Sequence, residues 1–65
     1  MEVFLNGVKI PTEAATLSQL IEQQRIPVAG IAVAVGSRVV RREQWEATPL
    51  EEDCEITVIR ATQGG

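Results

Sequence analysis

The stretch VFLNGVKIPTEAATLSQLIEQQ, residues 3–24, decides how this chain folds. Its first part places Asn6-Gly7 between two apolar runs, which is the pattern of a tight two-residue β-hairpin. Further along, Thr16 is followed three positions later by Gln19, which matches a helix-capping box. Residues 3–24 therefore predict two antiparallel strands followed by a helix.

The predicted helix has one apolar side and a defined end. Leu17, Leu20 and Ile21 fall at i, i+3 and i+4, so they form a single stripe that can pack against a sheet. Arg25 favours the end of the helix, and Pro27 enforces it. Before the helix, the missing backbone donor of Pro11 ends the second strand.

The second half of the chain predicts three more strands. Residues 31–35 are rich in β-branched side chains, which is typical of a central strand. Gly36-Ser37 predicts a turn, after which residues 38–42 read as a short, charged strand. Residues 54–60 predict the last strand, with alternate residues that leave both of its faces at least partly covered.

The segment between the last two predicted strands is expected to be irregular. It contains Trp45, then Leu50, whose side chain is expected to be buried in the core, and then an exposed acidic turn at 51–53. The order of elements predicts an α+β fold with one helix over one sheet. Because a single helix covers only one face of a sheet, the other face is left to water or to a partner, and Phe4 is a candidate for that face.

Composition limits what the chain can do. Its 65 residues make one domain at most, expected at 1–60 with a flexible C-terminal tail at 61–65. The formal net charge of -3 argues against a nucleic-acid partner. One cysteine, no membrane-length apolar run and no signal peptide fit a cytoplasmic protein that does not associate with a membrane.

Catalytic chemistry of its own is not expected from this chain. There is no histidine, so the usual general base at neutral pH is missing. Cys54 lies between Asp53 and Glu55, whose negative charges disfavour a reactive thiolate, and is interpreted as structural. The acidic turn lacks the spaced ligands of a metal site, so neither a metal nor a permanently bound cofactor is predicted.

The final Gly64-Gly65 is the strongest indication of function. Glycine has no Cβ, so such a tail could pass through a narrow channel, and residues 61–65 could extend roughly 17 Å from the domain. A partner enzyme could use ATP to convert the Gly65 carboxylate into an acyl-adenylate, which sulfur or an amine could then attack. The opposing interpretation is a loose, inert terminus.

Segments along essentially the whole chain resemble the sulfur carriers of thiamine biosynthesis, which are ubiquitin-like members of the β-grasp superfamily. The most specific segments are IAVAVGSRVV at 31–40, REQW at 42–45, residues 50–56 and the final Gly64-Gly65, and the opening VFLNG at 3–7 is also similar. The resemblance implies a mixed five-stranded sheet packed on one helix, with the first and last strands parallel at its centre.

Three positions depart from that family's usual pattern. Arg41 stands where the family usually has proline, Asp53-Cys54 where it usually has Gly-Asp, and Gly36 where it often has asparagine. Asp and Gly both tolerate left-handed turn conformations, so the fold is expected to survive these changes. Arg41 and Cys54 bear on the identity of the partner more than on the mechanism.

The resemblance also implies that the protein is a substrate of other enzymes and not itself an enzyme. An E1-like adenylating enzyme would activate Gly65 with ATP, a cysteine desulfurase relay would supply the sulfur of a thiocarboxylate, and thiazole synthase would accept that sulfur. Gly64 and Gln63 would thread the tail into these active sites. The candidate partner surface consists of Phe4, Arg38, Arg41, Arg42 and Arg60, with a solvated strand edge as the alternative for the arginines.

Three other functions stay open. The small subunit of molybdopterin synthase resembles this fold and ending, although it is generally longer and the Arg-x-x-Trp segment argues against it. A ubiquitin-like modifier would join Gly65 to lysines and give conjugates on a denaturing gel. An interaction domain with an inert tail would be indifferent to removal of Gly64-Gly65.

Overall fold

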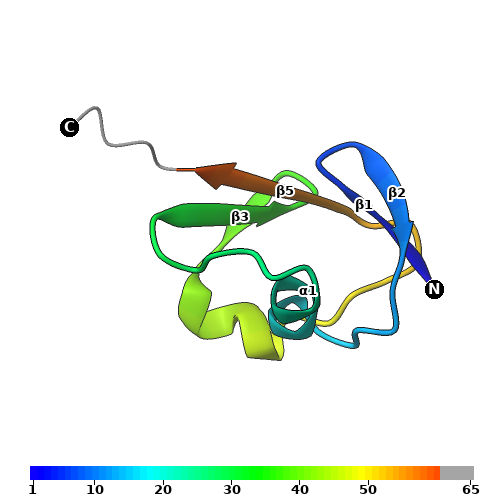
Figure 1. Cartoon of the computed structure of the whole chain (residues 1–65), viewed down its shortest axis with the longest axis horizontal. Coiled ribbons are helices and arrows are strands. Elements are labelled where there is room, and N and C mark those ends of the chain that lie inside the picture. The colour runs from blue at the N-terminus through cyan, green and yellow to red at the C-terminus, as the bar shows by residue number, and fades with distance from the viewer. Residues whose placement is uncertain (61–65) are drawn as a thin grey trace.

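A computed structural model describes residues 1–60, and the predicted tail at 61–65 lies outside the described residues. The elements are β1 (Glu2–Leu5), β2 (Val8–Pro11), α1 (Leu17–Gln23), β3 (Ile31–Val35), β4 (Arg38–Val40), the 3-10 helix η1 (Arg42–Ala47) and β5 (Glu55–Arg60). They form a five-stranded sheet in the order β2-β1-β5-β3-β4. Figure 1 shows α1 on one side of this sheet. The predicted ubiquitin-like β-grasp fold is confirmed.

The first hairpin forms because its turn suits Asn6 and Gly7. Both residues have positive φ, 52° and 84°, which a two-residue turn of type I′ requires and which these residue types tolerate. The turn pairs Leu5 with Val8 and so places Val3 opposite Ile10. The tight turn therefore fixes which side chains of both strands point to the core.

β5 lies between the two halves of the sheet and joins them. It pairs in parallel with β1 and antiparallel with β3. The side-chain oxygen of Asn6 also accepts a hydrogen bond of 2.8 Å from the backbone N–H of Val58. The first and last strands are thus parallel at the centre, as the family resemblance implied, and β3 is the inner strand beside β5.

The predicted capping box starts α1. The Thr16 hydroxyl accepts the backbone N–H of Gln19 at 3.3 Å, and the Gln19 side chain accepts the backbone N–H of Ala15 at 2.7 Å. Both side chains thus satisfy donors near the helix start that have no partner within the helix. This pair of bonds fixes the position at which α1 begins.

A left-handed residue ends α1. Arg25 has a φ of 56°, and its N–H donates to the Glu22 carbonyl at 3.0 Å, while the Ile26 N–H donates to the Ile21 carbonyl at 3.1 Å. This is the Schellman arrangement, in which glycine usually occupies the position of Arg25. The end of the helix lies where the sequence predicts it, in a backbone conformation that an arginine side chain disfavours.

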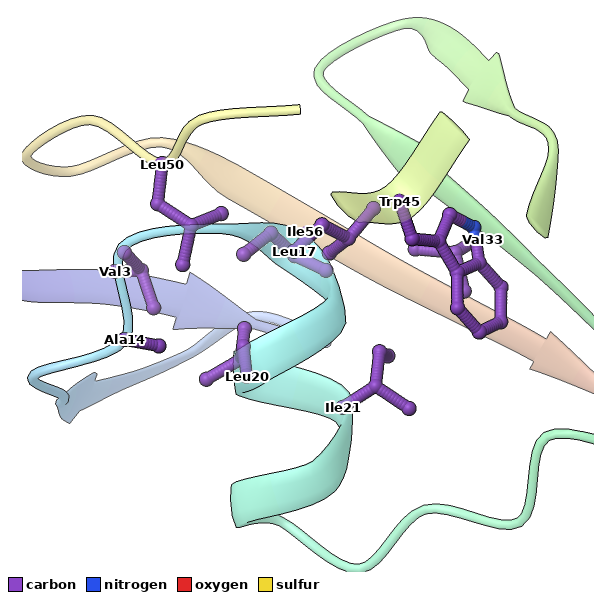
Figure 2. Close-up of a cluster of buried hydrophobic side chains, with 9 residues drawn as sticks. All are labelled: Val3, Ala14, Leu17, Leu20, Ile21, Val33, Trp45, Leu50 and Ile56. Carbon is purple, nitrogen blue, oxygen red and sulfur yellow. The ribbon is translucent and has the colours of Figure 1, made fainter. Parts of the chain in front are cut away.

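The core lies between α1, η1 and one face of the sheet (Figure 2). Leu17, Leu20 and Ile21 are the predicted stripe of α1, and all three are buried against Val33 and Ile56 of the sheet. Figure 2 draws the complete buried cluster, which is Val3, Ala14, Leu17, Leu20, Ile21, Val33, Trp45, Leu50 and Ile56. The predicted role of Leu50 as a core residue is confirmed.

The structure corrects the expectations for residues 38–47. The predicted strand at 38–42 ends at Val40, and Arg41 caps the 3-10 helix that contains Arg42. Trp45 belongs to that helix, is buried, and its indole N–H donates to the Val40 carbonyl at 3.0 Å. Burial of the indole against the core turns the chain away from the sheet edge, so a continued strand was the wrong prediction.

β5 also differs from its predicted form. It begins at Glu55, with Cys54 half-buried just before it and packed against the core. Thr57 and Ile59 are exposed, and Ile59 is 51% exposed, so the second face of this strand is covered only in part. Within residues 1–60, the helices cover the other face alone. In this part of the chain, no helix is long and apolar enough to cross a membrane.

Candidate functional site

The predicted reactive and threading positions, Gly65, Gly64 and Gln63, lie outside the described residues. The structure describes the domain from which this segment continues. Arg60 is the last residue of β5 and pairs with Ile31, the first residue of β3. The chain therefore leaves the domain from the central strand, at the end of the sheet where β3 begins.

The sheet face opposite α1 is called here the open face. Its outward residues include Phe4, Ala32, Ala34, Val39, Thr57 and Ile59, and the charged Lys9 and Glu55 lie beside Phe4 on the same face. The register pairs Ala34 with both Thr57 and Val39, and pairs Ala32 with Ile59, so these side chains are neighbours. Val39 is 66% exposed and Ile59 is 51% exposed. Exposed apolar side chains gathered in one place are typical of a protein-binding surface.

Phe4 lies near the β2 edge of the open face, where it is half-buried. It borders a hollow of about 310 Å³ whose lining also includes Gly7, Glu55 and Thr57. Lys9 pairs with Phe4 across the hairpin, and its ammonium lies 5.6 Å from the centre of the ring. The predicted placement of Phe4 on the second face of the sheet is confirmed.

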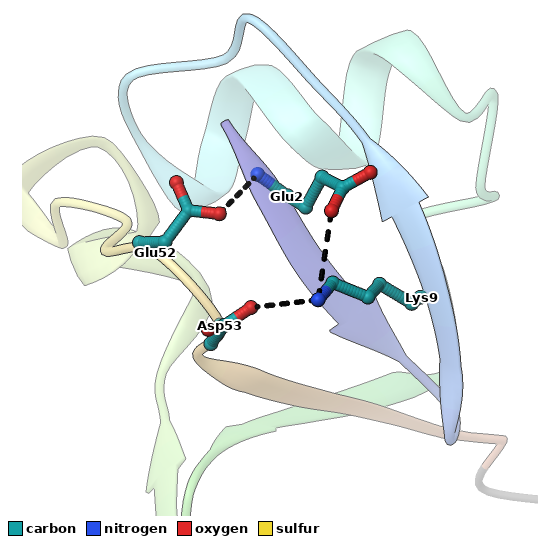
Figure 3. Close-up of polar contacts among 4 residues, drawn as sticks. All are labelled: Glu2, Lys9, Glu52 and Asp53. Carbon is teal, nitrogen blue, oxygen red and sulfur yellow. Dashed lines mark hydrogen bonds and ion pairs between the residues drawn. The ribbon is translucent and has the colours of Figure 1, made fainter.

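Lys9 holds the acidic turn against the first hairpin (Figure 3). Its ammonium lies 3.4 Å from an Asp53 oxygen and 3.5 Å from a Glu2 oxygen. The hydrogen bond to Asp53, the charge of Asp53 and the charge of Glu2 together raise the pKa of Lys9. Glu52 accepts the backbone N–H of Glu2 at 3.1 Å. The predicted acidic turn is thus tied to β1 at the start of β5.

The predicted arginine patch is spread over several elements. Arg38 begins β4, Arg41 precedes η1, Arg42 lies in η1, and Arg60 ends β5. All four are exposed, and within residues 1–60 the only ion pairs are those of Lys9. Because the chain turns at Val40, Arg42 lines a groove on the helix side. Whether the arginines bind a partner stays a prediction.

Four apolar residues of the open face were absent from the predicted partner surface, namely Ala32, Ala34, Val39 and Ile59. The signal that could have found them is the two-residue alternation of strands, because each lies out of phase with a buried neighbour such as Val33. No cluster of three or more metal-ligating side chains occurs among the residues that the structure describes.

Comparison with known proteins places the chain in a family. The sequence model of the ThiS family matches residues 4–65. A crystal structure of the thiamine biosynthesis protein ThiS from Geobacter metallireducens has a TM-score of 0.85 to this structure, with 20% sequence identity over 100% of both chains. At that identity, the likeness supports the shared fold. A search of curated proteins gave no match. The resemblance found in the sequence is thereby confirmed, and the chain belongs to the ThiS family.

Proposed function

We propose that this protein is a sulfur carrier in thiamine biosynthesis, whose Gly65 carboxylate is converted to a thiocarboxylate by partner enzymes. The observation that carries the proposal is the family match, which runs from β1 to the final glycine and so includes the proposed reactive residue. The absence of histidine from the sequence and the half-buried position of Cys54 also favour a protein that is acted upon by others.

In the proposed activation step, the Gly65 carboxylate attacks the α-phosphorus of ATP and pyrophosphate leaves. An E1-like adenylating enzyme catalyses this step. The resulting acyl-adenylate carries no carboxylate charge and has AMP as its leaving group, so the glycyl carbonyl accepts a sulfur nucleophile. The protein itself contributes the carboxylate and the surface by which the enzyme holds it.

In the proposed transfer step, a persulfide from a cysteine desulfurase relay attacks the activated carbonyl and displaces AMP. This leaves an acyl disulfide, and a thiol of the partner then attacks its S–S bond. The thiocarboxylate of Gly65 leaves, and the partner retains a disulfide. A cellular thiol reductant then reduces this disulfide back to the partner's thiols. Thiazole synthase is the proposed acceptor of the sulfur.

The open face is the proposed docking surface for the adenylating enzyme. It exposes Val39 and Ile59, and it includes β5, the strand from which the tail continues. Burial of these side chains in an interface would remove apolar surface from water, which favours association. Docking and chemistry are then separated along the chain, because the folded domain is recognised and the last residues react.

The test is the intact mass of the protein isolated from its own host under thiamine starvation, with fragmentation of the C-terminal peptide. We expect one oxygen of Gly65 to be replaced by sulfur. A variant that lacks Gly65 should lose sulfur transfer while keeping its melting temperature, since no core residue is changed.

Other outcomes of this experiment would contradict the proposal. An unmodified terminus under starvation would argue against a carrier, and Gly65 linked to lysine would identify a modifier. A thiocarboxylate that a purified molybdopterin-forming enzyme consumes and thiazole synthase does not would change the destination of the sulfur.

A further inference from the structure

A groove lies between α1 and η1, on the side of the molecule that the helices cover. Its volume is about 460 Å³. Ile21 and Trp45 contribute buried apolar side chains to its lining, and Val28 contributes one that is 38% exposed. The groove thus exposes the apolar side chain of Val28, above a floor formed by Ile21 and Trp45, on the face opposite the proposed docking site of the adenylating enzyme.

The charged residues that line this groove are mostly acidic. Glu22 comes from α1, and Glu43 and Glu46 come from η1, while Arg42 is the single cation that residues 1–60 contribute to the lining. None of the four forms an ion pair within residues 1–60. An exposed valine beside carboxylates that lack ion-pair partners within residues 1–60 favours a ligand with the complementary pattern.

We infer that this groove binds a segment of a partner protein that presents an apolar side chain flanked by lysine or arginine. The apolar side chain would contact Val28, and the cations would face Glu22 and Glu46. The carboxylates disfavour nucleic acid and anionic lipid, because both would place phosphates beside them. The protein's own residues 61–65, Ala-Thr-Gln-Gly-Gly, contain no cation and do not match the pattern.

The groove and the open face lie on opposite sides of the sheet. A carrier that is held through its open face would therefore still present the groove to a second protein. This inference is independent of the proposed sulfur chemistry, because it rests on the lining of the groove alone. Thiocarboxylate formation and groove binding can each fail without the other.

The test uses the fluorescence of Trp45, which is the only tryptophan of the chain and lines the groove. The full chain is titrated with the end-blocked peptide Lys-Leu-Lys-Leu-Lys. We expect a saturable change in fluorescence, and we expect Glu22→Lys and Glu46→Lys each to weaken binding about fivefold, as reversal of one exposed charge allows.

Glu51→Lys is the matched control, because it makes the same charge change at an exposed residue of the acidic turn. It should leave the affinity near that of the parent protein, and equal melting temperatures would show that all three variants fold. A Lys-Gly-Lys-Gly-Lys peptide tests the apolar requirement and should not give the saturable change.

Several results would overturn the inference. One is that Glu-Leu-Glu-Leu-Glu binds as tightly as the lysine-leucine peptide. Another is that Glu51→Lys loses as much affinity as Glu22→Lys and Glu46→Lys. A third is that the lysine-leucine peptide gives no saturable change in fluorescence. Self-association of the chain that Glu46→Lys abolishes without any peptide would also overturn it, because a second copy would then be the occupant.

Discussion

Ile56 and Ile59 lie on the same strand, three positions apart, and have opposite surroundings. The side chain of Ile56 is 1% exposed, whereas that of Ile59 is 51% exposed. The residues of α1 cover the first, and nothing within residues 1–60 covers the second. The comparison teaches that the covered face of this sheet supplies stability, while the open face leaves apolar side chains in contact with water.

The two faces also differ in how their side chains are held. On the covered face, Val3, Val33 and Ile56 are all buried by the same helical layer. On the open face, the polar contacts of Lys9 gather at one edge, beside Phe4. Five changes test this contrast, in order of decreasing expected effect.

Ile56→Ala should cause the largest loss. Truncation of a buried isoleucine leaves a cavity and lowers the free energy of unfolding by about 2–5 kcal/mol, a large part of the total for so small a domain. Ile59→Ala is the matched control and should change stability by about 0.5 kcal/mol or less. Urea denaturation followed by Trp45 fluorescence measures both. Equal losses would contradict the assignment of the two faces.

Ile59→Asp should separate recognition from folding. The melting temperature should be nearly unchanged, and the affinity for the adenylating enzyme should fall about tenfold, since a carboxylate would be placed in an apolar interface. Pyrophosphate release at varied concentrations of the carrier measures this. Glu13→Gln, on the helix side of the chain, should have no effect. Normal activation of Ile59→Asp would remove the open face from the docking model.

Thr16→Ala tests how firmly α1 is fixed over the covered face. Loss of the hydroxyl that accepts the Gln19 N–H should lower the free energy of unfolding by about 1 kcal/mol. Thr16→Ser keeps an oxygen acceptor and should be close to neutral. If the serine and alanine variants were equally destabilised, the cap hydrogen bond would not be the cause.

Arg25→Gly should increase stability at the other end of α1. Arg25 has a φ of 56°, and removal of its Cβ should relieve backbone strain by about 0.5–1 kcal/mol. Arg25→Ala retains the Cβ and should give no comparable gain. Thermal unfolding of the three proteins, monitored by circular dichroism, provides the comparison. A gain in the alanine variant would point to the charge and not to the backbone.

The smallest effect is expected from Lys9 on the open face. Its pKa is raised in the folded protein, mainly by the hydrogen bond to Asp53 and then by the charges of Asp53 and Glu2. Its contribution to stability is complete below the pKa of the unfolded chain and is lost as the pH rises through the higher folded value. Thermal unfolding should therefore show a small loss of stability at strongly alkaline pH. Lys9→Gln should not show this loss.

The parts of the fold that sequence predicts correctly are those that neighbouring residues determine. Asn6-Gly7 alone specifies a tight turn, and Thr16 with Gln19 specifies a helix start within four positions. The 3-10 helix η1 was not predicted because Trp45 is buried in the core with residues of α1, which are distant in sequence, and this burial makes the chain leave the sheet after Val40. The periodicity of hydrophobic residues along a short segment does not predict such a contact.

The candidate site was predicted in part for a related reason. Strand alternation was sufficient to place Phe4 opposite Val3 and hence on the second face. Ile59 and Val39 could be assigned to the same surface only once it was known which face α1 covers and which strands are neighbours. Arg38, Arg41 and Arg42 are close in sequence, but the turn after Val40 places Arg42 on the helix side.

The central place of β5 has a consequence for the synthesis of this protein. The hairpins β1–β2 and β3–β4 can each form from local pairs, but they share no strand pairing until β5 enters between them. Residues as far apart as Asn6 and Val58, 52 positions, then become bonded. A nascent chain that lacks β5 has two small hairpins with unpaired edges, which invite aggregation and proteolysis. On the ribosome, the sheet therefore cannot be completed until β5 has been synthesised. A folded molecule is one whose chain has been made at least to the end of β5.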